Sequence, residues 1–287
     1  MRTETITSAQ NPKIKNLLLL QEKSKARKEQ GLFVVEGRRE LEHCIEAGYT
    51  VRTLFVCPEV AGVSAAFDSA GNYFSGWDPK NQFPATSLFH HLTRAEAPSV
   101  IEIPEQLYRK VAYREGTEGI IAEVECKSLT LEELQLPENP LVVVLESVEK
   151  PGNLGAVLRS ADAAGADAVL ICDPLTDLYN PNLIRASIGA VFTVPTVAVS
   201  SREAIGFLKA KGIQILTAQL QDSSLYYDVD MRRGTALVMG TEATGLTQAW
   251  RQAADAHIRI PMLGRLDSLN VSVSTAILLF EAVRQRQ

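Results

Sequence analysis

The residues best suited to chemistry lie in the C-terminal half, and the first group of them combines glycines with an arginine. The apolar run LVVVL (141–145) leads into KPGNLGAVLRSADAAGA, so Gly152 to Gly155 are predicted to form a strand-to-helix turn. Asn153 lies in this turn, and we expect Arg159 to lie one turn into the helix, facing the loop. A guanidinium in that position is suited to stabilise negative charge that develops on a reacting group.

Two other interpretations of this segment require no catalytic arginine. A dinucleotide-binding turn would use Asp173, just after the second strand, to bind a ribose, but Pro151 breaks the G-x-G-x-x-G spacing. In a purely structural role, Arg159 would be a surface residue paired with Asp162. The segment by itself leaves the structural role open.

The second group is a glycine-rich loop that follows the apolar run ALVMG and reads GTEATGL, from Gly240 to Leu246. Its two glycines, Gly240 and Gly245, allow close approach to a ligand, and Glu242 offers an acceptor beside exposed amides. The loop lacks the Gly-Lys-Ser/Thr ending of a phosphate-binding loop, and its only charge is negative. It therefore favours a ligand with a cation or hydrogen-bond donors, while a plain glycine-rich turn is the structural alternative.

The third group spans the end of a predicted strand and the start of the C-terminal helix. Ile260-Pro261-Met262 closes the strand, and Ser268-Leu269-Asn270-Val271-Ser272 opens the helix, with Ser268 near the N-cap. Packing does not explain this polar start, which suits a turn that binds a ligand through amides and hydroxyls. The apolar stretch from Ala276 to Phe280 exceeds one buried face, so we expect the helix to contact both the sheet and a partner subunit.

The elements that must position these groups form a regular pattern after Pro140. Apolar runs typical of strands alternate with helical stretches, and the runs lie at 141–145, 168–172, 191–199, 213–218, 236–240 and 257–261. Continuous apolar runs predict strands buried on both faces, hence a parallel sheet covered by helices. Such sheets bind ligands beyond the carboxyl ends of their strands, where the three groups lie.

The N-terminal part is organised differently. Residues 11–30 predict a basic helix, 32–57 predict a strand, a helix and a strand, and 119–125 predict a further strand. We therefore expect an N-terminal domain over 1–126, a linker over 127–140 and a C-terminal domain over 141–287.

Composition limits the class of protein. The net charge is −5, yet the first forty residues hold nine Lys or Arg against five Asp or Glu, as in a nucleic-acid-binding arm or a solvated helix face. No run approaches the roughly 20 apolar residues of a membrane span, and no signal peptide pattern is present. The four cysteines are scattered without zinc-ligand spacing, and His90 and His91 receive no role. We expect a reduced cytoplasmic protein with no metal and no membrane contact.

Taken in order, the three groups resemble the SpoU, or TrmH, family of RNA ribose methyltransferases in the SPOUT superfamily. The matching motifs are Asn153-x-Gly155-x-x-x-Arg159, Gly240-x-Glu242-x-x-Gly245-Leu246, and Ile260-Pro261-Met262 followed by Ser268-Leu269-Asn270-Val271-Ser272. The resemblance covers 141–287 and, more loosely, 33–48 and 118–125. It implies an α/β fold: a parallel sheet flanked by helices with a deep trefoil knot, plus a smaller N-terminal α/β RNA-binding domain.

The resemblance also implies a homodimer that binds S-adenosylmethionine at the knot and methylates a ribose 2′-hydroxyl of structured RNA. The implied catalytic residues are Arg159, Asn153, Glu242, Ser268 and Asn270. The implied cofactor-binding residues are Thr217, Ala218, Gln219, Gly240, Gly245, Ile260, Met262 and Leu269. Arg159 would act either as the base or by stabilising charge, and the very high pKa of a guanidinium makes the second role equally suitable.

The separate N-terminal domain favours ribosomal over transfer RNA as the substrate. The candidate phosphate contacts are Lys13, Lys15, Lys23, Lys25, Arg27, Arg38 and Arg39. Two other functions remain open. One is a nicotinamide-dependent Rossmann enzyme, and the other is a non-catalytic RNA-binding or ribosome-assembly factor with the same fold.

Overall fold

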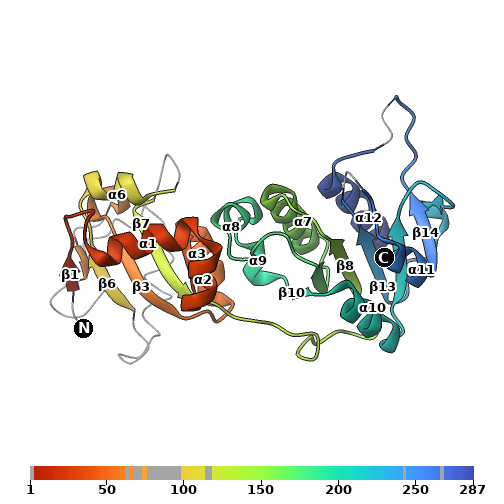
Figure 1. Cartoon of the computed structure of the whole chain (residues 1–287), viewed down its shortest axis with the longest axis horizontal. Coiled ribbons are helices and arrows are strands. Elements are labelled where there is room, and N and C mark those ends of the chain that lie inside the picture. The colour runs from red at the N-terminus through yellow and green to blue at the C-terminus, as the bar shows by residue number, and fades with distance from the viewer. Residues whose placement is uncertain are drawn as a thin grey trace. The chain divides into compact units, whose positions relative to one another are not determined.

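The computed structural model describes residues 3–62, 65–67, 73–75, 98–113, 118–241, 244–265 and 268–287. The chain forms two compact units, Met1–Lys127 with Tyr179–Ile184, and Ser128–Leu178 with Arg185–Gln287 (Figure 1). Tyr179–Ile184 thus groups with the first unit, although it lies within the predicted C-terminal domain. Tyr179 stacks on Phe33 with ring centroids 4.2 Å apart, which accounts for this grouping.

The first unit is built on a mixed five-stranded sheet in the order β1-β6-β3-β7-β2. Its strands are β1 (Thr3–Thr5), β2 (Leu32–Glu36), β3 (Val51–Val56), β6 (Ser99–Glu102) and β7 (Ile120–Glu125), beside a separate pair β4 (Ala65–Phe67) and β5 (Tyr73–Ser75). Its helices are α1 (Pro12–Glu22), α2 (Ser24–Gln30), α3 (Arg38–Glu46), α4 (Pro58–Ala61) and α6 (Glu105–Val111). Strand β7 runs antiparallel to both β2 and β3.

The basic segment 11–30 forms two helices, whereas the sequence predicted one. Asn11 caps α1 by accepting from the amide of Lys13, and Pro12 suits the first helical position. Lys23 is extended at φ −111° and separates α1 from α2, which ends at Gly31 in the left-handed region at φ 64°. Ile14, Leu17 and Leu20 of α1 are fully buried in the core of this unit.

The second unit contains a seven-stranded sheet in the order β10-β9-β8-β13-β11-β14-β12, and every pairing is parallel. The strands are β8 (Leu141–Glu146), β9 (Ala168–Cys172), β10 (Thr196–Val199), β11 (Gln214–Ala218), β12 (Ser224–Leu225), β13 (Thr235–Met239) and β14 (Ala256–Arg259). The predicted parallel sheet is confirmed. The predicted strand 191–199 is wrong in its first half, because Ala190–Thr193 is helical and the strand begins only after Pro195.

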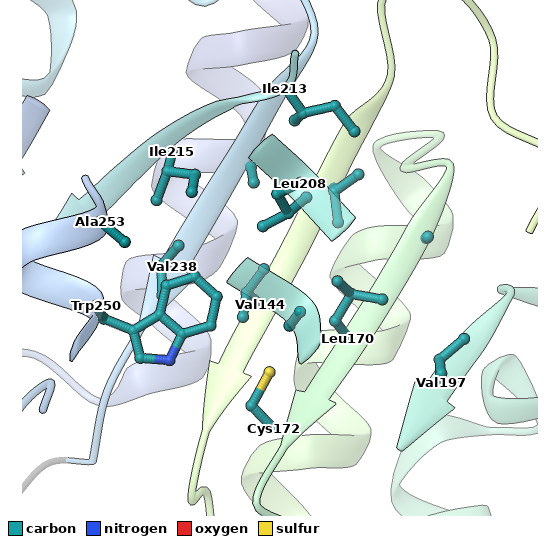
Figure 2. Close-up of a cluster of buried hydrophobic side chains, with 14 of the residues drawn as sticks. Val144, Leu170, Cys172, Val197, Leu208, Ile213, Ile215, Val238, Trp250 and Ala253 are labelled. Carbon is teal, nitrogen blue, oxygen red and sulfur yellow. The ribbon is translucent and has the colours of Figure 1, made fainter. Parts of the chain in front are cut away.

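Helices flank this sheet and bury its strands. They are α7 (Pro151–Ala163), α9 (Ala190–Thr193), α10 (Ser201–Ala210), η1 (Tyr226–Asp228), α11 (Gln248–Ala253) and α12 (Val271–Arg286). Helix α8 (Pro181–Ser187) is divided between the two units, because Tyr179–Ile184 groups with the first. Figure 2 shows the core where α10 and α11 meet the sheet, with Trp250 packed beside Val144 and Val238. Leu131 and Leu134, from the predicted linker, are buried in the same core. Helices α7 and α12 pack against each other.

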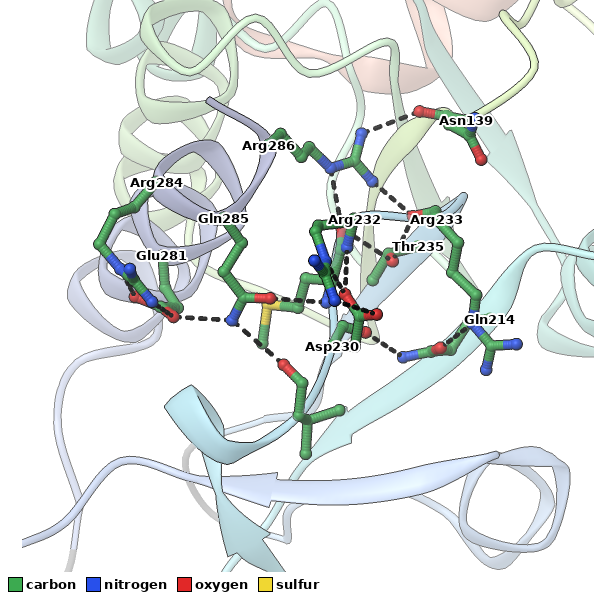
Figure 3. Close-up of polar contacts among 12 residues, drawn as sticks. Asn139, Gln214, Asp230, Arg232, Arg233, Thr235, Glu281, Arg284, Gln285 and Arg286 are labelled. Atoms are coloured by element: carbon green, nitrogen blue, oxygen red, sulfur yellow. Dashed lines mark hydrogen bonds and ion pairs between the residues drawn. The ribbon is translucent and has the colours of Figure 1, made fainter.

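The end of α12 is tied to the amino ends of the strands (Figure 3). The Arg286 guanidinium donates to the carbonyls of Met231 (2.9 Å), Arg233 (2.8 Å), Asn139 (2.8 Å) and Pro140 (3.2 Å). These carbonyls lie just before β13 and β8, so one side chain joins three segments of the chain. Among the described helices, none is long and apolar enough to cross a bilayer.

Candidate functional site

The first and third motifs meet beyond the carboxyl ends of the strands. Asn270 caps α12, because its Oδ1 accepts from the amide of Ser272 at 3.0 Å. Its Nδ2 donates to Oδ1 of Asn153 at 3.1 Å, and Asn153 lies in the first turn of α7. Two amides 117 positions apart in sequence are thereby held together.

Arg159 lies deeper along α7 than the sequence predicted. The helix begins at Pro151, so Arg159 is about 12 Å along the axis from its start, and the prediction of one turn is wrong. Its side chain is exposed and takes part in no hydrogen bond or ion pair among the described residues. The alternative pairing with Asp162 is not formed either, since that carboxylate accepts from Thr193 Oγ1 at 2.9 Å. Arg159 is therefore available to a ligand.

The glycine-rich loop closes on itself at its base. A Cβ at Gly240 would lie 2.4 Å from the carbonyl carbon of Gly245, and Gly245 has φ +66°, so both positions require glycine. The amide of Gly245 donates to the carbonyl of Thr241 at 3.0 Å. Glu242 lies outside the described residues. In this structure the close approach at Gly240 is to the backbone of the loop itself.

A cavity of about 150 Å³ lies at the ends of β11 and β14, beside the start of α12. The predicted site residues that line it are Ala218, Gln219, Ile260, Met262, Ser268 and Leu269. Five residues that the sequence did not single out also line it: Leu220, Ile258, Arg259, Ser274 and Leu278. Ser274 and Leu278 are one helical turn apart, so extending the third motif along one face of α12 would have found them.

Gln219, which lines this cavity, has a buried acceptor. Its Oε1 is buried and has no hydrogen-bond partner among the described residues, while its Nε2 donates to the carbonyl of Gln221 at 2.9 Å. A buried oxygen without a donor is costly, so a ligand that carries an N–H group would be favoured here. The surrounding Ile258 and Leu278 are fully buried and supply apolar contact.

Three predicted cofactor residues do not line this cavity: Thr217, Gly240 and Gly245. Thr217 is fully buried, and its Oγ1 is 2.6 Å from Nδ1 of His257 on the neighbouring strand. Successive side chains of a strand point to opposite faces, so Thr217 and Ala218 cannot both face the cavity. The structure places Thr217 in a strand-to-strand contact.

The predicted phosphate contacts differ in exposure. Lys13, Lys15, Lys23, Lys25 and Arg39 are exposed. Lys13 forms an ion pair with Glu4, and Lys25 lies 3.7 Å from a carboxylate oxygen of Glu29. Exposed pairs of this kind are weak enough to be exchanged for a phosphate.

Arg27 and Arg38 have structural partners. Arg27 is 2% exposed and donates to the carbonyls of Leu20 (2.6 Å) and Gln21 (3.1 Å), so it caps the end of α1 and cannot reach a phosphate in this structure. This corrects the prediction for Arg27. Arg38 is half-buried and donates to the carbonyl of Ala61 at 2.8 Å, and burial lowers its pKa.

Other chemistry receives little support from the described part of the chain. Within it, no three His, Cys, Asp or Glu side chains are grouped to hold a metal ion, and His90 and His91 lie outside it. Cys172 ends β9, but burial raises the pKa of its thiol, which disfavours a nucleophilic thiolate. Asp173, the ribose-binding acid of the dinucleotide alternative, instead accepts from Ser201 Oγ at 2.5 Å.

Comparison with known proteins agrees with this geometry. Residues 140–280 match the SpoU rRNA Methylase family, and residues 11–122 match the MRM3-like substrate binding domain. The 23S rRNA (guanosine-2'-O-)-methyltransferase RlmB of Ralstonia nicotianae is 37% identical over 202 residues, covering 68% of this chain and 81% of that protein.

Solved structures match nearly the whole chain. An RNA 2'-O ribose methyltransferase crystal structure is 38% identical with a TM-score of 0.78, over 98% of this chain and 99% of that one. The AdoMet-bound rRNA methyltransferase from Sinorhizobium meliloti is 28% identical with a TM-score of 0.83, over 99% of each chain.

The fold and site define a two-unit α/β protein whose ligand cavity lies at the carboxyl edge of a parallel sheet. The chain belongs to the SpoU rRNA methylase family, as its three motifs predicted. Members of this family use S-adenosylmethionine.

Proposed function

We propose that the protein transfers a methyl group from S-adenosylmethionine to a ribose 2′-hydroxyl of ribosomal RNA. The observation that carries the proposal is the cavity lined by Gln219, Ile260 and Leu269, next to a helix whose cap, Asn270, bonds Asn153. The third motif thus lines the cavity through Leu269 and contacts the first motif through Asn270. The names of the relatives, which are 23S rRNA methyltransferases, support ribosomal over transfer RNA.

The residues of the cavity fit the cofactor. S-adenosylmethionine carries an adenine and an α-amino group, both of which have N–H donors for the buried Oε1 of Gln219. The buried Ile258 and Leu278 suit the flat apolar face of a purine. When bound, the cofactor supplies an electrophilic methyl group on a sulfonium centre.

The chain itself must prepare the acceptor oxygen. A 2′-hydroxyl holds its proton tightly at neutral pH, so charge that develops on the oxygen needs a base or a cation. We assign this task to Arg159, whose exposed guanidinium is not engaged by the described residues. Asn153 and Asn270 orient the ribose, and Ser268 and Glu242 complete the polar group.

The same proposal includes the oligomeric state of the protein. Val273 and Phe280 of α12 are 48% and 49% exposed and lie two turns apart, which supports a homodimer formed through this helix. The proposal also includes a trefoil knot and cytoplasmic action, both of which membership in the family supports. Light scattering of the purified protein would test the dimer, and Phe280→Asp should shift it toward monomer.

We assign RNA selection to the first unit, through the exposed Lys15, Lys23, Lys25 and Arg39. Each phosphate contact adds to the salt dependence of binding, so neutralising these residues should weaken RNA binding and flatten its salt slope. An unchanged slope would contradict the assignment.

The activity is tested by incubating the full-length protein with ribosomal RNA and radiolabelled S-adenosylmethionine, then mapping 2′-O-methyl positions. We expect label at one nucleotide of the large-subunit RNA. RNA binding without incorporation of label would instead identify a non-catalytic RNA-binding factor.

A further inference from the structure

A buried carboxyl group at the carboxyl edge of the second sheet has no part in the site described above. Glu146 is the last residue of β8 and is only 2% exposed. Val142 and Val144 point to the same face of β8 and belong to the hydrophobic core beneath α10 and α11. Glu146 therefore lies on the same buried face as these two valines. Burying its carboxyl group costs free energy unless hydrogen bonds compensate for the lost hydration.

The compensating hydrogen bonds come mainly from one residue, Thr247, which follows the glycine-rich loop. The amide of Thr247 donates to Oε2 of Glu146 at 2.8 Å, and its Oγ1 donates to Oε1 at 2.7 Å. Both carboxyl oxygens are thus used by a residue 101 positions away in sequence. The end of β8 is thereby joined to the segment that leads into α11.

A second set of contacts holds Glu146 in place from the other side. Ser201, the first residue of α10, lies 3.4 Å from Oε1 of Glu146 through its Oγ. The same Oγ accepts from Nε1 of Trp250 at 2.9 Å and donates to Asp173 at 2.5 Å. The carboxyl group therefore belongs to a buried network whose other members are fixed by helix starts and strand ends.

The glycine-rich loop depends on this point of attachment. Strands β8 and β13 are neighbours with Leu145 paired to Met239, so Glu146 and Gly240 occupy the next positions at the edge. The loop closes between Gly240 and Gly245, and beyond it only Leu246, 4% exposed, and Thr247 precede α11. Leu246 supplies apolar contact, and the Glu146 carboxyl group fixes the direction of the backbone.

We propose that Glu146 is a positioning residue for the methyl-transfer reaction, which it serves by holding the Gly240–Gly245 loop through Thr247. This inference rests on the proposed function and on the cofactor role that the resemblance implies for Gly240 and Gly245, neither of which lines the cavity itself. A loop held in its binding conformation loses less entropy when the ligand binds, so removing the attachment lowers affinity without removing a ligand contact.

Calorimetric titration of the full-length protein with S-adenosylhomocysteine tests the proposal. Glu146→Ala should raise the Kd about tenfold, equivalent to about 1.4 kcal/mol. Thr247→Val, which removes one of the two hydrogen bonds, should raise it about threefold. The double variant should be no weaker than Glu146→Ala alone, because both changes remove the same interaction.

Two controls separate positioning from general stability. Glu146→Gln keeps an acceptor for the Thr247 amide and a donor for its hydroxyl, so it should restore most of the affinity. Arg286→Ala removes stabilising hydrogen bonds at the opposite edge of the sheet without touching the Glu146 network, so it should lower the melting temperature and leave the Kd unchanged.

The outcomes distinguish this inference from the proposed function. Wild-type protein that binds no S-adenosylhomocysteine would contradict the proposed function and the inference with it. Wild-type binding together with an unchanged Kd in Glu146→Ala and Thr247→Val would overturn the positioning role alone, as would equal weakening in Arg286→Ala. Because Thr247 is exposed, its variant decides the question even if Glu146→Ala does not fold.

Discussion

The two edges of the parallel sheet in the second unit differ in how their polar side chains are used. At the amino edge, Arg286 donates to four backbone carbonyls, and Gln285 contacts Met231, Val229 and Glu281. At the carboxyl edge, Gln219 keeps a buried oxygen without a donor. Arg159, on helix α7 that begins at this edge, is exposed with no hydrogen bond or ion pair among the described residues. Both edges contain internally satisfied polar groups, such as Glu146 with Thr247 at the carboxyl edge, but among these groups only Arg159 and the Gln219 oxygen are left for a ligand.

Helix α12 connects these edges, because it begins at Asn270 beside the site and ends at Arg286 in the carbonyl cluster. This helix therefore carries functional groups at its start and stabilising groups at its end. Substitutions at the carboxyl edge should therefore change activity more than stability, and those at the amino edge should do the reverse.

The largest effect is expected at Arg159, on the helix that begins at the carboxyl edge. Arg159→Ala should lower methyl transfer about 100- to 1000-fold, because it removes the cation that stabilises the developing oxyanion. Calorimetry should show an unchanged affinity for S-adenosylhomocysteine, since the motif assigns Arg159 to the acceptor side. Arg202→Ala, at an exposed arginine of α10, is the matched control and should retain full activity. A parallel loss of cofactor affinity in Arg159→Ala would contradict the assignment.

The amino edge should show the opposite behaviour. Arg286→Ala removes one donor from each of four carbonyls, among which Pro140 and Arg233 keep a second donor in Thr235, and it should lower the free energy of unfolding by about 2 kcal/mol. For a unit of this size the melting temperature should fall by about 4 to 8 °C, which differential scanning calorimetry would measure. Arg232→Ala, which removes only an exposed ion pair with Asp230, should leave the melting temperature unchanged. Equal melting temperatures for both variants would remove the distinction between the edges.

Asn270 tests both functions of the start of α12. Asn270→Ala should cost about 1 kcal/mol of stability through loss of the helix cap. Asn270→Asp keeps the capping oxygen but removes the donor to Asn153, so it should preserve stability and still lower activity. Full activity in Asn270→Asp would show that the contact between the two motifs is dispensable.

The smallest effect is a pH dependence at the amino edge. A hydrogen bond from Arg232 lowers the pKa of Asp230 to about 2, from an ordinary value of 3.8. Since the folded pKa lies below the unfolded one, the stabilisation is present above the unfolded value and is lost as pH falls toward 2. Asp230→Asn should remove this part of the acid unfolding profile. The difference should shrink in high salt, because the pair is exposed.

Several features of the fold could be predicted because they depend on local pattern. The apolar runs at 141–145 and 168–172 correspond closely to β8 and β9, since strands buried on both faces must be apolar throughout. The run at 191–199 was wrongly predicted to be a strand throughout, because VFTV suits a buried helical turn as well as a strand. Pro195 separates helix α9 from strand β10.

Charge patterns were a poorer guide to the site. Arg27 belongs to a basic stretch, yet its guanidinium is buried on the carbonyls at the end of α1. Whether a basic side chain faces solvent or the carbonyls at a helix end depends on the direction of the helix that carries it, which the local sequence does not specify. Glu146 was missed for the same reason, because nothing near it in sequence shows that Thr247 will be its partner.

The sequence by itself determined the buried strands, the order of the three motifs and the family to which they belong, because each depends on residue types at fixed local spacing. The tertiary structure alone decided which distant groups meet: Asn270 with Asn153, Glu146 with Thr247, and Arg286 with Asn139, which lie 117, 101 and 147 positions apart. Hydrogen bonds require donor and acceptor within about 3 Å, and only the path of the folded chain brings residues so far apart to that distance.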